Sequence, residues 1–84
     1  MFTKSEEFIV YDLQINIDRI IHLTNDRGLS INKMLKDAQL STSIIDNMKR
    51  GQKPSVDKIY AIAEYFDVSV DYLLGRTDKP EVNR

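Results

Sequence analysis

Residues 62–75 read IAEYFDVSVDYLLG, and this stretch indicates more about the fold than any other. Its first turns continue a stripe of apolar residues at the three- and four-residue spacing of an amphipathic α-helix. Ser69 follows a break in that spacing and can accept hydrogen bonds from the first turn of a new helix, which Gly75 then closes. The stretch therefore predicts two consecutive helices, over about 56–66 and 70–74.

The same combination of a helix-closing glycine and a following serine recurs toward the N-terminus. Gly28 and Gly51 each close an apolar-periodic stretch beside basic residues, as is typical of a helix C-terminus. Serines follow the breaks and predict the N-caps of four helices, namely Ser30, Ser41, Ser55 and Ser69. The chain is therefore predicted to be all-α, with helices over about 12–27, 31–38, 42–50, 56–66 and 70–74. The stripe of the fourth helix, which we expect to face the core, comprises Val56, Ile59, Tyr60, Ile62, Ala63 and Phe66.

The two ends of the chain differ from its middle. Residues 9–17 alternate apolar with polar residues as a strand does, whereas the preceding residues would suit a longer first helix. We favour a helix from about Asp12 and leave the structure of an N-terminal arm, residues 1–11, open. Residues 76–84 have almost no apolar content and predict a flexible C-terminal tail. One domain, over residues 12–75, lies between them.

Composition narrows the functional classes. The chain has 84 residues and no cysteine, which removes disulfides, thiolate metal sites and cysteine nucleophiles. Its apolar runs are too short to cross a membrane, and no signal peptide is visible, so we expect a cytoplasmic globular protein. His22 is the sole histidine, and no general base lies near the serines and threonine at 41–43. We therefore expect neither an enzyme nor a bound metal or cofactor.

Charge is unevenly distributed along the chain. The net charge of −1 argues at first against a nucleic-acid partner. By segment, however, residues 1–18 sum to −3, residues 30–54 to +3 and residues 55–75 to −3. The positive excess therefore coincides with the two short helices in the middle of the chain.

The lengths of those two helices and of the turn between them suit a pair that places its second helix in a DNA major groove. About three residues join them, so the second can stand out from the body with its polar face toward a major groove. The outward residues of that helix are Thr42, Ser43, Asp46, Asn47, Lys49 and Arg50. We expect Ile45 and Met48 to face the core and Ile44 to be partly exposed. Short polar side chains on a helix are also common on ordinary solvated surfaces, so this pattern alone does not decide the function.

The chain also resembles a known family. Residues 49–55 (KRGQKPS) and residues 62–75 are similar to the corresponding parts of phage-repressor-like (Cro/cI-type, XRE) helix-turn-helix regulators, and the match covers about residues 17–75. The resemblance implies a compact five-helix bundle of the lambda-repressor-like DNA-binding type. It makes 31–38 and 42–50 the helix-turn-helix, with 42–50 as the recognition helix.

The resemblance also implies contacts for individual residues. Base contacts fall on Thr42, Ser43, Asp46 and Asn47, and phosphate contacts on Asn32, Lys49, Arg50, Gln52 and Lys53. Three positions depart from the family pattern: Ile31 replaces a phosphate-anchoring Gln, Leu35 replaces a small residue, and Gln39 replaces a turn glycine. Gln39 must then adopt a left-handed conformation or the turn must change. A pair of charged residues common in the family is also absent, because Thr24 and Lys49 occupy its positions.

These observations lead to an expected function and an alternative. We expect a sequence-specific regulator that binds double-stranded DNA as a homodimer, a phage or prophage-type repressor that occupies an operator, with no small-molecule ligand. The alternative is a protein-interaction module on the same fold, antitoxin-like or an anti-repressor partner, whose surface would comprise the apolar residues 8–11 and the acidic start of the first helix. Salt separates the two, because DNA binding weakens steeply with added salt while an apolar protein interface barely responds.

Overall fold

The computed structural model describes residues 12–82, and this range is all-helical with no strand. Its helices are α2 (Leu13–Asp26), α3 (Ile31–Asp37), α4 (Ile44–Lys49), α5 (Val56–Phe66) and α6 (Val70–Leu73). The all-α, five-helix architecture predicted from the sequence is confirmed. The predicted N-terminal arm, residues 1–11, lies outside the described residues.

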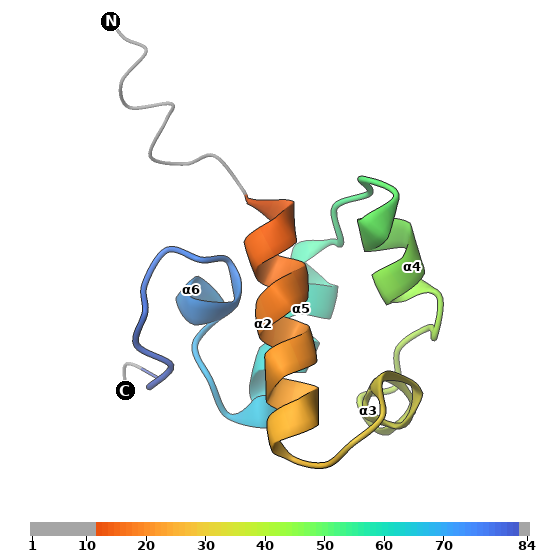
Figure 1. The fold of residues 1–84 in the computed structure, drawn as a ribbon, viewed down its shortest axis with the longest axis horizontal. Coiled ribbons are helices and arrows are strands. Elements are labelled where there is room, and N and C mark those ends of the chain that lie inside the picture. Colours follow the sequence, from red (N-terminus) through yellow and green to blue (C-terminus); the bar gives the residue numbers. More distant parts are fainter. Residues whose placement is uncertain (1–11, 83–84) are drawn as a thin grey trace, which may run out of the picture.

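Helix α2 is the element around which the others are arranged (Figure 1). It packs against α3, α4 and α6, and α5 packs against α6. In Figure 1, α3 and α4 lie on one side of α2, while α6 and the C-terminal segment lie on the other, with α5 behind. The helix-turn-helix pair is therefore carried on one side of a long central helix.

The core is formed by apolar side chains from every described helix. Its largest fully buried members include Ile20, Met34, Leu35, Ile62, Phe66 and Leu73. The bulky Leu35 is accommodated without exposure. Ile44, expected to be partly exposed, is only 5% exposed, so that prediction is wrong. The reason is that α4 is shorter than predicted and turns both of its first two residues inward.

The apolar stripe of α5 is also narrower than predicted. Val56 is 80% exposed and Tyr60 is 57% exposed, whereas Ile59, Ile62 and Phe66 are buried. Val56 and Tyr60 lie four residues apart and so share one side of the helix. No described neighbour covers that side, and the prediction that both face the core is wrong.

The four serines predicted as N-caps differ in their positions and hydrogen bonds. Ser30 Oγ accepts from the N–H of Lys33, and Ser69 Oγ accepts from the N–H of Tyr72, each at 3.0 Å. Ser55 occupies the N-cap position of α5 without a side-chain hydrogen bond. Ser41 is not an N-cap, contrary to prediction, because residues 42–43 form a turn and Ser43 takes the N-cap position of α4.

All five described helices end in the same local structure. A backbone N–H two or three residues after the last helical residue donates to the carbonyl oxygen five residues earlier in the chain, with N···O distances between 2.7 and 3.0 Å. The residue before each such N–H has positive φ, and these residues are Gly28, Gln39, Gly51, Asp67 and Gly75. Gln39, with φ 62°, thus takes the left-handed conformation that the missing turn glycine requires.

Two polar side chains of α2 join it to α6. Asn16 is fully buried, and its Nδ2 donates to the carbonyl oxygen of Leu73 at 2.8 Å. The Arg19 guanidinium lies 4.3 Å from the centre of the Tyr72 ring and donates to the Tyr72 carbonyl oxygen at 2.7 Å. The first bond supplies a donor to the Leu73 carbonyl oxygen at the end of α6, and the second adds a donor to the Tyr72 carbonyl oxygen, which also accepts from the N–H of Gly75 at 3.1 Å.

Arg19 also holds residues that follow α6. It donates to the carbonyl oxygen of Thr77 and pairs with Asp78 at 3.0 Å. Farther along, the N–H of Ser69 donates to the carbonyl oxygen of Pro80 at 2.9 Å. We refer to residues 77–80 as the C-terminal strap, because they lie against α2 and α6 on the side away from α4. The division of the chain into arm, domain and flexible tail stays a prediction.

Candidate nucleic-acid interface

Burial of one side of α4 determines which of its residues face outward. Ile44, Ile45 and Met48 are buried in the core. Helical spacing then turns Asp46, Lys49 and Arg50 to solvent, and all three are exposed. Asn47 is half-buried, between the core side and the exposed side. The polar side of α4 therefore combines hydrogen-bonding groups with two cations.

The turn before α4 presents two of the predicted base-contacting residues. Thr42 and Ser43 are both exposed and precede the first helical residue rather than lying within the helix. The hydroxyls of Ser41 and Ser43 are hydrogen-bonded to each other at 2.7 Å, and the N–H of Ser43 donates to Ser41 Oγ at 3.2 Å. Ser41 thus fixes the conformation of the turn from which Thr42 projects.

A shallow hollow of about 320 Å³ lies beside α4 and the loop that follows it. Its lining comprises Ile44, Asn47, Met48, Gln52, Lys53, Pro54 and Lys58. The structure therefore brings together three predicted site residues, Asn47, Gln52 and Lys53. Thr42, Ser43, Asp46, Lys49 and Arg50 do not line this hollow.

Lys58 lines this hollow too and was not among the predicted site residues. Lys58 belongs to the first turns of α5, and its charge was counted within the acidic segment 55–75. The chain reverses between α4 and α5, so Lys58 lines the same hollow as Lys53, although Asp57 of the acidic segment is its neighbour in the chain. An exposed cation just after a basic loop was the available signal.

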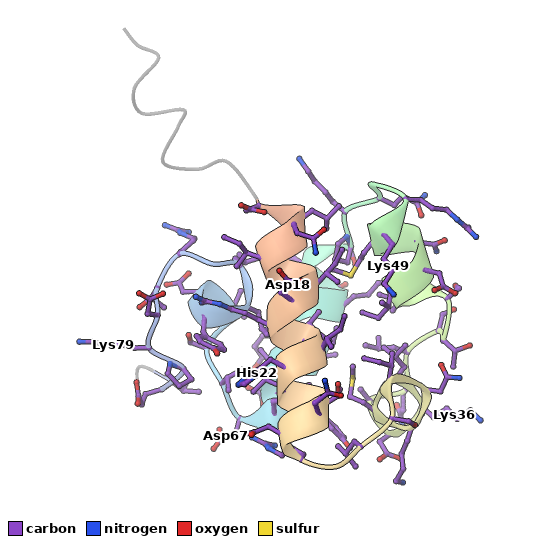
Figure 2. All side chains as sticks on the ribbon, in the orientation of Figure 1. Asp18, His22, Lys36, Lys49, Asp67 and Lys79 are labelled. Carbon is purple, nitrogen blue, oxygen red and sulfur yellow. The ribbon has the colours of Figure 1, made fainter. Side chains whose placement is uncertain are left out.

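Helix α3 carries the remaining predicted phosphate contact. Asn32 is exposed in its first turn, and Lys36 points away from the body of the molecule (Figure 2). Lys33 is also exposed, but its ammonium lies 3.3 Å from the carboxylate of Asp37. Ile31, which replaces a polar residue common in the family, packs against the core instead. Figure 2 shows Lys36 and Lys49 on the same side of α2, whereas Lys79 lies on the opposite side.

A hydrogen bond links α3 to α5. The Tyr65 hydroxyl donates to the Asp37 carboxylate at 3.0 Å. This bond, with that from Lys33, holds the pKa of Asp37 below its ordinary value. Burial and the same bond to the carboxylate raise the pKa of Tyr65. The pair helps to fix the position of α3 relative to the scaffold.

Outside this interface, few polar side chains of the described residues come together. Residues 12–82 contain no group of three or more His, Asp or Glu side chains suited to a metal ion. His22 is exposed, and its neighbour Asp18 accepts a hydrogen bond from Gln14 at 2.8 Å. Thr24 is buried and donates to the carbonyl oxygen of Ile21 at 2.7 Å. No described helix is long and apolar enough to span a membrane.

Comparison with known proteins identifies the family. A model of the helix-turn-helix family matches residues 24–73. Over 30 residues, the chain is 53% identical to the uncharacterized HTH-type transcriptional regulator YobD of Bacillus subtilis (strain 168). That match covers 36% of this chain and only 27% of the relative. No solved structure matched the chain. Because the family model covers more than half of the chain and confirms the resemblance seen in the sequence, the protein belongs to the XRE-type helix-turn-helix family of DNA-binding domains.

Proposed function

We propose that the protein is a transcriptional regulator that binds double-stranded DNA at specific sequences. It acts in the cytoplasm as a phage or prophage-type repressor, by occupying an operator. The observation that carries the proposal is the outward face of α4, where Asp46, Lys49 and Arg50 are exposed beside a hollow containing Lys53 and Lys58. The relative from B. subtilis, named as an HTH-type transcriptional regulator, supports the same class.

Base reading is assigned to the start and outward face of α4. A major groove about 12 Å wide admits the helix. Asn47 is suited to the paired donor and acceptor of adenine, and the Asp46 carboxylate can accept from the amino group of cytosine. Thr42 and Ser43 supply hydroxyl groups at the N-terminal end of the helix, although the Ser43 hydroxyl is also hydrogen-bonded to Ser41.

Phosphate binding is assigned to residues around that helix. They are Asn32 on α3, Lys49 and Arg50 at the end of α4, Gln52 and Lys53 in the loop, and Lys58 on α5. These side chains would set the position of α4 without reading sequence. Because the net charge is only −1, non-specific attraction to DNA is weak and base contacts must supply much of the selectivity.

Two copies are needed to reach the usual specificity of such a regulator. One short recognition helix reads few base pairs, and two copies spaced by about 34 Å read successive major grooves of a near-palindrome. We therefore propose a homodimer on DNA, with no small-molecule ligand required for binding.

The test is selection of bound sequences from random duplex DNA at two salt concentrations. The proposal expects enrichment of a near-palindromic site and an affinity that falls steeply with salt. Lys53→Ala or Arg50→Ala should weaken binding to all sequences alike and reduce the salt slope by about one. Lys79→Ala, on the opposite side of α2, is the matched control and should change neither. No enrichment, with binding insensitive to salt, would instead support the protein-interaction alternative.

A further inference from the structure

Two serine hydroxyls are joined in the turn that leads into α4. Ser43 Oγ lies 2.7 Å from Ser41 Oγ, and the N–H of Ser43 also donates to Ser41 Oγ at 3.2 Å. Both serines are exposed, whereas Ile44 and Ile45, which follow them, are buried and anchor the turn to the core. The Ser43 hydroxyl is therefore held in one place on the surface assigned to base reading.

This arrangement differs from that of the serines at other helix starts. Ser30 and Ser69 each use the hydroxyl to accept from an N–H three residues later, inside the helix that they begin. Ser43 occupies the N-cap position of α4 but makes no such side-chain bond, because its hydroxyl is bonded to Ser41 instead. The Ser43 hydroxyl therefore keeps bonding capacity for a partner outside the chain.

The N–H of Ser43 favours one polarity of the hydroxyl pair. The distance between the two oxygens allows either hydroxyl to be the donor. Because Ser41 Oγ already accepts from that N–H, donation from Ser41 O–H to Ser43 Oγ forms a chain in which each bond strengthens the next. The reverse polarity would place two donors of Ser43 on one oxygen. The O–H of Ser43 is thus the outward donor of the pair.

We propose that Ser41 is a positioning residue for base reading, and that it orients Ser43 as a donor toward a base carbonyl oxygen, guanine O6 or thymine O4. The inference rests on the proposed function and narrows it, because a serine hydroxyl can otherwise donate or accept. Adenine presents an amino group in place of guanine O6, and cytosine does so in place of thymine O4. Ser43 therefore disfavours adenine and cytosine at the position that it contacts.

The experiment measures base preference with the full-length chain. Affinities for the selected site and for its single-base variants are compared between the original chain and substituted chains. Ser43→Ala should reduce the preference for the carbonyl base at one base pair by about threefold to tenfold. Ser41→Ala should reduce the preference at the same base pair, because the Ser43 hydroxyl is then no longer oriented. The double substitution should reduce it no further than Ser43→Ala alone, since both changes act through one hydroxyl.

Two further variants separate positioning from stability. Ser41→Thr keeps the hydroxyl and should keep the base preference. Ser69→Ala removes a serine hydroxyl that accepts from the N–H of Tyr72 at the start of α6, on the other side of α2 from α4. It should leave the preference at every base pair unchanged. Circular dichroism and urea denaturation verify that each variant is folded.

The outcomes separate this inference from the proposed function. An enriched site whose base preference is unchanged in Ser41→Ala would overturn the positioning role and leave the proposed function intact. An equal loss of affinity for all sequences in that variant would do the same, since it reports only a weakened turn. A preference for adenine or cytosine at the base pair that depends on Ser43 would overturn the donor assignment. A chain that enriches no sequence would refute the proposed function, and this inference with it.

Discussion

The two sides of α2 use polar side chains in opposite ways. On the side of α6, Asn16 and Arg19 direct their donors to backbone carbonyl oxygens and hold residues far apart in sequence. On the side of α4, polar and charged side chains such as Asp46 and Lys49 are exposed around a buried apolar row. Under the proposed function, stability and DNA recognition therefore depend on separate sets of residues, which substitutions can distinguish.

The largest expected effect is on the α6 side. Asn16→Ala removes a buried donor, leaves the carbonyl oxygen of Leu73 without that bond and opens a small cavity. We expect a loss of about 2–4 kcal/mol in the free energy of unfolding, measured by urea denaturation. Gln14→Ala, two residues earlier and exposed, is the control and should change stability by less than about 0.5 kcal/mol. Equal effects of the two changes would contradict the structural role of Asn16.

The next test concerns the C-terminal strap. Arg19→Ala removes the bonds to Tyr72, Thr77 and Asp78 together with the contact to the Tyr72 ring. We expect it to lower the free energy of unfolding by about 1–3 kcal/mol. Arg19→Lys should recover only part of this, because an ammonium cannot reproduce the forked geometry.

The control for Arg19 is its exposed partner. Asp78→Ala removes only a solvent-exposed ion pair and should cost less than about 1 kcal/mol. Faster amide hydrogen exchange at Ser69, whose N–H is bonded to Pro80, would report release of the strap in Arg19→Ala. Unchanged exchange would show that Arg19 does not hold it.

On the α4 side the effects should appear in binding instead. Asn47→Ala should weaken binding to the selected site by about 1–3 kcal/mol and relax the preference at one base pair. Its unfolding free energy should move by no more than about 0.5 kcal/mol. If selection returned the same site with the same affinity, the assignment of Asn47 to base reading would be wrong.

The smallest expected effect lies at the contact between the two regions. Tyr65→Phe removes the hydroxyl that donates to Asp37, so the lowered pKa of Asp37 should rise toward its ordinary value in an NMR titration. A depressed carboxyl pKa stabilises the fold above the unfolded-state pKa, and this contribution is lost as pH falls through the folded-state pKa. The free energy of unfolding of the variant should therefore depend less on pH in the acidic range. In the unsubstituted protein, the raised pKa of Tyr65 acts oppositely: its contribution to stability is present below the ordinary tyrosine pKa and is lost as pH rises through the raised pKa.

Local signals predicted much of this structure. Ser30, Ser69 and the glycines at 28, 51 and 75 lie at helix ends as expected, because caps and left-handed residues act within one turn of the chain. Helical spacing also predicted that Asp46, Lys49 and Arg50 face outward, whereas Thr42 and Ser43, predicted to lie within the helix, are in the turn before it.

Contacts between distant segments were not predictable in this way. Arg19 and Thr77 are 58 residues apart, and Asn16 reads as an ordinary polar residue until α6 lies over it. Val56 and Tyr60 fit an apolar helical stripe, but whether a stripe is covered depends on the neighbours that the fold supplies. The position of Lys58 in the basic hollow was not predictable either, because it depends on the reversal of the chain after α4.

The C-terminal strap has a practical consequence for how the protein can be handled. Arg19 and Ser69 hold residues 77–80 on the side of α2 opposite α4, away from the helices to which we assign DNA contact. A fluorescent reporter, surface tether or purification tag joined there should leave operator access unobstructed. Attachment in the loop near Lys53 would instead fall on the face to which we assign DNA binding.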